Sequence, residues 1–345
     1  MRYESTSAAI LMRPGYNGGM DRHALLAIDT STEICSVAVC FPLPTGEHAF
    51  APTTQALSTI GREVRATPAT EPIDVTEASV YDDHAAGLRF ITIERLTGSV
   101  SSGFILPAID AVLSAAGMSL PECGALAFGA GPGSFTGLRT ATGVAQGLAF
   151  GANLKVLPVN TLMACAESAR QRGKLADCTH VLAVMDARMS QCYWEVFDGL
   201  ATDGSWRSLA PSAVSDPSAI VVPVVGNEER SLADTLSSLA LSQKYAVVGN
   251  GANVYGDQLR VIETAYCVDT DARPSATAIA AVAWRDWLAG RAVAPAEALP
   301  RYVRDKVAST TVEREVERAE RAEQAERAAV AKRAALAAVV QEGKS

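Results

Sequence analysis

The chain has 345 residues, of which 48% are hydrophobic and 20% charged, a composition typical of a globular protein and unlike that of a disordered chain. Its formal net charge of −8 argues against a protein that grips a nucleic-acid backbone by itself, so a partner would supply most of the positive surface for any RNA. The seven cysteines form no CxxC pair and no stretch approaches the roughly 20 apolar residues of a membrane span, so we expect reduced thiols and a cytoplasmic protein with no membrane segment.

Regular structure is expected only after a first stretch without periodicity. Residues 1–23 are predicted to be a flexible tail. An apolar strand at 25–29 and a second at 35–41, joined by a polar turn, predict a β-hairpin with Asp29 where the first strand ends. Residues 42–88 are rich in Thr, Pro, Ala and Ser and predict a mobile insertion.

Strands and helices then alternate, which is a signature of α/β folds. The predicted elements are a strand at 89–93, a helix at 102–117, a strand at 125–129, a helix ending near Phe150, a strand at 155–159 and a helix at 161–170. We assign residues 24–160 to a first lobe.

The second half opens like the first. An apolar strand ends in Asp186 and Cys192 follows six positions later, as Cys35 follows Asp29. This echo predicts a duplicated α/β unit and therefore two similar lobes.

The second lobe is assigned to residues 161–310. It contains a strand and glycine turn at 245–251 and a closing helix at 275–288. From 311 to 345 the chain is rich in Glu, Arg and Ala, with opposite charges at i,i+4 spacing, and predicts a charged helical tail.

Two features of the first lobe could hold a phosphate group. Asp29, Thr30 and Ser31 at a hairpin tip offer hydroxyls for phosphate oxygens and a carboxylate for hydrated Mg²⁺, although Asp and Thr also simply favour turns. The loop with Gly131 and Gly133 could leave helix-start N–H groups free for an anion, or could be a purely structural turn.

The helix after this loop carries Gly143 and Gly147, although a glycine inside a helix costs about 1 kcal/mol relative to alanine. Something must therefore approach this helix closely. Its own sheet and a helix of another subunit are both possible. The four histidines are scattered without HxxxH or HxxE spacing, so no metal site is predicted.

A family resemblance joins these features. The segments LLAIDTSTEICSVAV, FILPAIDAVLSAAGMSL, ALAFGAGPGSFTGLRTATGVAQGLAFG, VLAVMDARMSQCYWEVF and ALPRYVRDKVA, in this order from about Leu25 to Ala308, closely resemble the TsaB (YeaZ) family. The resemblance implies an α/β, two-lobed actin-like ATPase fold (ASKHA, ribonuclease H-like) with a duplicated βββαβα unit. It also implies a non-catalytic role as dimerisation partner of the catalytic paralogue TsaD, together with the ATPase TsaE, in threonylcarbamoyl transfer to tRNA.

The resemblance also implies roles for particular residues. The catalytic paralogue holds its metal with an HxxxH pair on the helix that corresponds to 102–117, where this sequence has no histidine, so no catalytic residue, metal or cofactor is expected. tRNA would be met only indirectly through the complex, and the protein could pair with itself when its partner is missing. Family members pair through first-lobe helices, which predicts an interface containing Ile109, Val112, Leu113, Thr140, Gly143 and Gly147. A vestigial nucleotide cleft would contain Asp29, Thr30, Ser31, Gly131, Gly133, Gly249 and Gly251.

Two other functions remain open at this point. The first is an active ATP-dependent, kinase-like enzyme of the same fold, with Asp186 as general base unless Arg188 holds it in a salt bridge. The second is a metallopeptidase, for which the sequence shows no His or Cys cluster.

Overall fold

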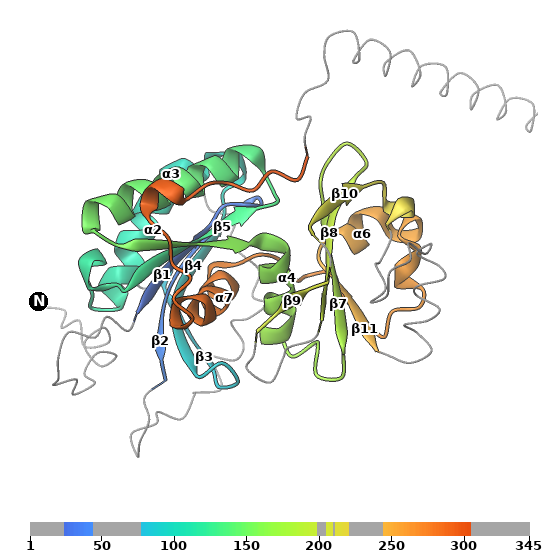
Figure 1. Cartoon of the computed structure of the whole chain (residues 1–345), viewed down its shortest axis with the longest axis horizontal. Coiled ribbons are helices and arrows are strands. Elements are labelled where there is room, and N and C mark those ends of the chain that lie inside the picture. The colour runs from blue at the N-terminus through green and yellow to red at the C-terminus, as the bar shows by residue number, and fades with distance from the viewer. Residues whose placement is uncertain (1–23, 44–76, 199–204, 210, 221–243, 305–345) are drawn as a thin grey trace, which may run out of the picture. The chain divides into compact units, whose positions relative to one another are not determined.

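Two mixed β-sheets organise the chain in the computed structural model (Figure 1). The structure describes residues 24–43, 77–198, 205–209, 211–220 and 244–304. Within these ranges, no helix is both long and apolar enough to cross a membrane.

The first sheet has the strand order β3-β4-β2-β1-β5-β6. Its strands are β1 (Leu25–Asp29), β2 (Ile34–Pro42), β3 (Ser79–Asp83), β4 (Leu88–Leu96), β5 (Ala125–Gly131) and β6 (Lys155–Asn160). The strands β1 to β4 pair antiparallel, whereas β5 and β6 run parallel to β1. A parallel addition to an antiparallel meander needs helical crossovers, and α2 (Ser101–Ala115) and α3 (Phe135–Ala152) supply them.

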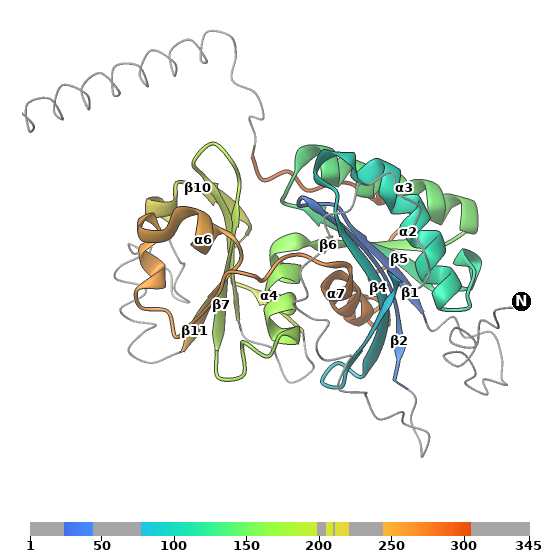
Figure 2. The same cartoon turned by 180° about the vertical axis from the view of Figure 1, so that it is seen from behind.

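Alternation along β1 divides the first sheet into two apolar faces. Leu26 and Ile28 join a core under α2 and α3, whereas Leu25 and Ala27 join a core with α7 (Ala276–Leu288). Figure 2 shows α2 and α3 on one side of this sheet and α7 on the other.

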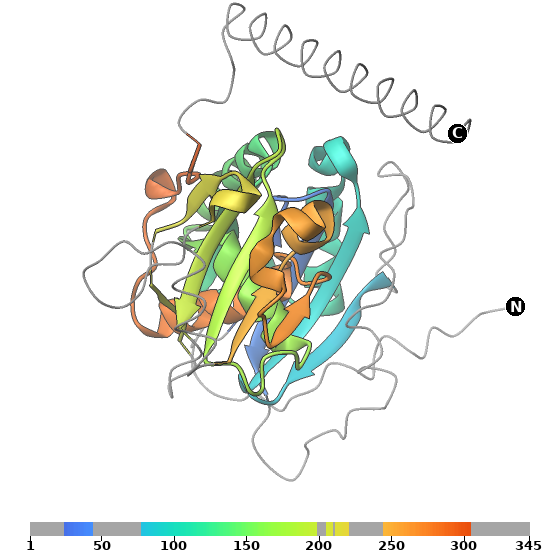
Figure 3. The same cartoon turned by 90° about the vertical axis from the view of Figure 1, so that its right-hand side faces the viewer.

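The second sheet has the order β10-β8-β7-β11-β12, with β9 paired to β8. Its strands are β7 (His180–Asp186), β8 (Cys192–Asp198), β9 (Arg207–Ser208), β10 (Ala213–Ser215), β11 (Tyr245–Val248) and β12 (Cys267–Asp269). The short helix α6 (Gly251–Tyr255) covers one face, seen in front of the strands in Figure 3. Short 3-10 turns are found at Gly98–Val100, Leu120–Glu122, Pro217–Ala219, Gly256–Gln258, Arg260–Ile262 and Pro295–Glu297.

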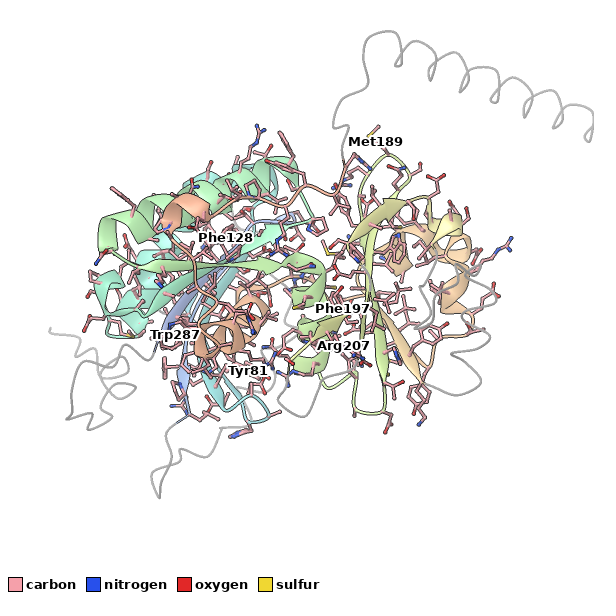
Figure 4. The ribbon with its side chains drawn as sticks, viewed as in Figure 1. Tyr81, Phe128, Met189, Phe197, Arg207 and Trp287 are labelled. Carbon is pink, nitrogen blue, oxygen red and sulfur yellow. The ribbon has the colours of Figure 1, made fainter. Side chains whose placement is uncertain are left out.

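Helix α4 (Thr161–Gln171) belongs to the cores of both sheets. Its Ala164 packs with the α7 side of the first sheet, whereas Leu162 and Cys165 pack with the second sheet around Phe197. The helices α4 and α7 also contact each other, so they form a layer between the sheets (Figure 1). Figure 4 marks Phe128 in the first sheet and Phe197 in the second.

A buried ionic network fixes this middle layer. The carboxylate of Glu167, on α4, is fully buried and accepts hydrogen bonds from Arg170, Arg285 of α7 and the indole N–H of Trp206. Arg170 also forms an ion pair with Asp83 of β3. The network therefore connects α4 with both neighbouring sheets.

The predicted α/β fold with two actin-like halves is confirmed, and each strand and helix predicted within the described residues has a counterpart close to its predicted bounds. Strand β3 lies inside the predicted insertion at 42–88, and α7, assigned to the second lobe, packs on the first sheet. The predicted tails at 1–23 and 311–345, and positions 44–76 of the insertion, lie outside the described residues.

Candidate functional site

Asp29 lies at the carboxyl end of β1 and is fully buried. Because side chains alternate along the strand, its carboxyl group points to the same side as Leu25 and Ala27, toward α4. The backbone N–H and hydroxyl of Ser31 both donate to its Oδ2, at 3.3 and 2.9 Å. Its Oδ1 is buried and has no hydrogen-bond partner among the described residues.

This environment changes the acidity of Asp29. Burial raises the pKa of its carboxyl group from 3.8 to about 7, against the two hydrogen bonds from Ser31, which lower it, and with a small further increase from the charge of Glu94. The carboxyl group therefore titrates near neutral pH.

The glycine loop between β5 and α3 packs on the chain's own backbone. A Cβ at Gly131, whose φ is +118°, would lie 2.5 Å from the carbonyl oxygen of Arg301, and one at Gly133 would lie 2.6 Å from that of Ser31. The hydroxyl of Thr30 donates to the Gly137 carbonyl at 2.7 Å. Thr30, Gly131 and Gly133 thus each make a close contact within the chain that needs no ligand.

The corresponding glycines of the second half are packed in the same way. Gly249, with φ +108°, lies against the backbone carbonyl of Val184, and a Cβ at Gly251 would be 2.6 Å from a methyl carbon of the same valine. The loop between them anchors the neighbouring hairpin, because the side chain of Asn250 accepts from the backbone N–H of Asp186.

Asp186 is not equivalent to Asp29, despite their similar sequence positions. Leu182 and Val184 face the core with α6, so alternation along β7 places Asp186 on that outer side. Its carboxylate accepts from the hydroxyl of Tyr255, at 2.6 Å, and forms an ion pair with Arg188. Asp186 is therefore a structural anchor of the hairpin, on the side of its sheet away from Asp29.

The tip of that hairpin has an unusual backbone. Arg188, Met189 and Ser190 all have positive φ, between 54° and 61°, a region that non-glycine residues seldom occupy and that costs of order 1 kcal/mol each. The same hydroxyl of Tyr255 also lies 2.9 Å from the Gln191 carbonyl oxygen, so its single O–H is shared between Asp186 and the backbone at the end of the tip. Figure 4 shows Met189 at this end of the second sheet, at the top of the view.

Sequence reasoning missed two buried carboxylates near the middle layer. Glu195 of β8 is almost fully buried and accepts from Asn160, at 2.7 Å, and from the hydroxyl of Ser212. The other is Glu167 of α4, which is fully buried. Each is a charged residue inside an otherwise apolar or small-residue segment, and this is the signal that could have found them.

The predicted partner-interface residues divide into two groups. Ile109, Val112 and Leu113 lie on the face of α2 that is buried in the core of the first sheet, so they cannot form an exposed contact surface in this conformation. Thr140 is half-buried and donates to the Thr136 carbonyl. The sequence pattern of α2 identified its apolar stripe correctly, but that stripe packs inward.

Gly143 and Gly147 lie on the outer side of α3, together with Gly151. All three are exposed, and a Cβ at any of them would meet no atom of the described residues within 4 Å. Their own sheet therefore does not require glycine at these positions. We call these three residues the glycine face. It is flanked by Phe150, which is 83% exposed, and the neighbouring helix α2 exposes Leu106 by 48%.

No group of three or more His, Cys, Asp or Glu side chains is arranged to hold a metal ion within the described ranges. All seven cysteines are free thiols.

Comparison with known proteins agrees with this architecture. Residues 100–341 match the family model described as "TsaD: tRNA N6-adenosine threonylcarbamoyltransferase". A solved structure described as "YeaZ from Pseudomonas aeruginosa" superposes with a TM-score of 0.56 at 27% identity, covering 81% of this chain and 99% of that one. A second, described as an uncharacterised protein similar to peptidase YeaZ from the same organism, gives a TM-score of 0.57 at 28% identity, covering 82% of this chain and 100% of that one. The two sheets, with α4 and α7 between them, define a protein of the actin-like ATPase class.

Relatives of similar sequence identify the family within this class. The chain is 34% identical over 205 residues to the tRNA threonylcarbamoyladenosine biosynthesis protein TsaB of Escherichia coli K12, covering 59% of this chain and 80% of the relative. It is 33% identical to the protein of the same name from Haemophilus influenzae, covering 57% and 66%. The chain belongs to the TsaB/TsaD family. The two relatives named here are TsaB members of that family.

Proposed function

We propose that this protein takes part in tRNA threonylcarbamoyladenosine biosynthesis as a non-catalytic subunit that pairs with the catalytic, TsaD-type paralogue. In this proposal the TsaE-type ATPase joins the pair, and tRNA is bound mainly by the partners. The curated relatives carry the name of this pathway, and the family model describes the transferase itself.

The glycine face is the observation that carries the proposal. Glycine in an exposed helix is less favourable than alanine by about 0.5–1 kcal/mol, and at Gly143, Gly147 and Gly151 no contact with the described residues compensates. Small residues at four-residue spacing let the backbone of a second helix approach closely. The exposed side chains of Phe150 and Leu106 add apolar area of the kind that marks interaction sites.

The candidate nucleotide cleft does not favour the kinase-like alternative. The glycines on both sides already pack on the chain's own backbone, and Asp186 is engaged by Tyr255 on the outer side of its sheet. The proposed function therefore uses neither the glycine loops nor Asp186.

The test is a reconstitution with the TsaD-type and TsaE-type proteins of the same genome, the threonylcarbamoyl donor, ATP and unmodified tRNA. Pairing and modified adenosine should both depend on this protein. Gly143→Leu and Gly147→Leu should abolish pairing and modification without lowering thermal stability, because a Cβ at either position meets no atom of the described residues within 4 Å. Val254→Leu, at an exposed position of α6, is the matched control and should leave both unchanged.

Two results would count against the proposal. Modification that proceeds equally well without this protein would remove its role in the pathway, and ATP turnover by the protein alone would favour the kinase-like alternative. Without a partner, we expect the glycine face to mediate self-pairing, seen by light scattering as a dimer that Gly143→Leu converts to a monomer.

A further inference from the structure

Arg139 is an exposed arginine of α3 whose orientation is fixed by aromatic residues. The central carbon of its guanidinium lies 3.7 Å from the centre of the Phe135 ring, and its Nε donates to the hydroxyl of Tyr302 at 3.2 Å. The two rings also contact each other, with centroids 5.3 Å apart. An exposed arginine normally samples many rotamers, so this arrangement removes much of the entropy that binding would otherwise cost.

The segment that supplies Tyr302 is itself anchored. Residues 298–303, which we call the strap, run along α3. The side chain of Gln146 donates to the Ala298 carbonyl at 2.8 Å, and the backbone N–H of Arg301 donates to the Ala130 carbonyl at 2.6 Å. These contacts, spread along α3 and the glycine loop, fix the strap, so the position of the Tyr302 hydroxyl beside the guanidinium is set by the fold.

The charge of Arg139 has no acidic partner within the described part of the chain. Other exposed arginines differ in this respect, since Arg207 pairs with Asp198 and Arg291 with Asp286. With Nε engaged by Tyr302, the two terminal nitrogens still form a planar fork, the geometry that binds both oxygens of a carboxylate.

Arg139 is continuous with the glycine face. It precedes Gly143 by one helical turn, and Gly147 and Gly151 follow at the same four-residue interval along α3. A protein that packs on the glycine face therefore reaches the guanidinium at the end of the same stripe.

We propose that Arg139 binds a side-chain carboxylate of the protein that packs on the glycine face. The inference rests on the proposed pairing with the TsaD-type paralogue. The contact with Arg139 would orient that partner on α3. A carboxylate suits this surface better than an RNA backbone, because α2, α3 and the strap together contain only two basic residues, Arg139 and Arg301, and one acidic residue, Asp110. Tight RNA binding needs several cations spaced along the phosphates.

The experiment measures the dissociation constant between the full-length chain and the TsaD-type paralogue at low and high salt. Arg139→Ala should weaken pairing about 10- to 100-fold at low salt and less at high salt, since a charge-assisted bidentate contact is lost. Arg139→Lys should recover only part of the loss, because lysine keeps the charge without the fork. Tyr302→Phe should weaken pairing several-fold by releasing the guanidinium. Arg260→Ala, at an exposed arginine with no ion pair among the described residues, is the control and should have no effect.

The outcomes distinguish this inference from the proposed pairing with the TsaD-type paralogue, on which it rests. Unchanged affinity in Arg139→Ala, while Gly143→Leu still abolishes pairing, would overturn the carboxylate contact and leave the pairing face intact. No effect of either variant would overturn both. Normal pairing with reduced crosslinking of tRNA to the Arg139→Ala complex would overturn the inference in favour of an RNA phosphate. Restoration of affinity between Arg139→Glu and a single Asp→Arg or Glu→Arg variant of the paralogue would support it directly and identify the acidic residue.

Discussion

Replacement of Asp29 by asparagine tests how strongly burial raises the pKa of the carboxyl group at the end of β1. The fully buried carboxyl group has its pKa raised from 3.8 to about 7 by burial, so the folded protein holds this proton more tightly than the unfolded chain. The contribution to stability is therefore complete below about pH 4 and is lost as the pH rises through about 7. At about 1.4 kcal/mol per pH unit, the full loss is roughly 4 kcal/mol.

Asp29→Asn keeps an oxygen to accept from Ser31 but cannot ionise. Any cost of the amide itself is independent of pH, so the informative quantity is the difference in unfolding free energy between the two proteins as pH changes. That difference should shift in favour of the variant by roughly 3 kcal/mol between pH 4.5 and pH 8.

The assay is urea unfolding followed by tryptophan fluorescence and circular dichroism at several pH values. All other titrating groups are shared, so their effects cancel in the comparison. Parallel stability profiles for the two proteins, differing by a constant amount from pH 4.5 to pH 8, would refute the reasoning. Pairing with the TsaD-type paralogue should survive Asp29→Asn, because the residue is buried away from the glycine face.

Three further substitutions test other parts of the structure. Gly143→Ala should stabilise the isolated protomer by about 0.5–1 kcal/mol in thermal unfolding, since the methyl group meets open space and alanine favours the helix; a destabilised variant would show that something in the protomer needs that glycine. Gly137→Ala should behave oppositely and lower expression and melting temperature, because its Cβ would overlap the Thr30 carbonyl, and a stable variant would contradict the close packing. Glu167→Ala should cost about 3–5 kcal/mol in chemical denaturation, because it leaves Arg170 and Arg285 with less charge compensation in a buried layer. A loss below about 1 kcal/mol would mean that water or rearrangement replaces the carboxylate.

Local pattern predicted most of the strands and helices of the described chain, because apolar alternation and glycine turns are local properties. Strand β3 was missed, since Ser79–Asp83 follows an irregular run and gains its order from pairing with β4. The placement of α7 on the first sheet also could not be predicted, because it depends on which of two apolar surfaces a late segment of chain meets.

The candidate site shows the same limit. The sequence echo between Asp29 and Asp186 suggested equivalent roles, yet Asp29 pairs with Ser36 across its hairpin and Asp186 with Cys192, so one loop is a residue longer than the other. Alternation then places the two carboxylates on different sides of their sheets. Likewise, the pattern of α2 located Ile109 and Val112 on an apolar stripe but could not say whether that stripe met the sheet or a partner. Conversely, the exposure of Gly143 and Gly147 became evident only from three-dimensional packing.

The shared position of α4 determines whether the two halves of the chain can fold as separate fragments. One helix completes the apolar cores of both sheets, and its Glu167 is neutralised by side chains from either side of it. Neither half of the chain would keep a finished interior without the other, although sequence duplication suggests two separable modules. We therefore expect a break between β6 and β7 to yield insoluble fragments, and heat to melt the two sheets and the helices between them in a single transition.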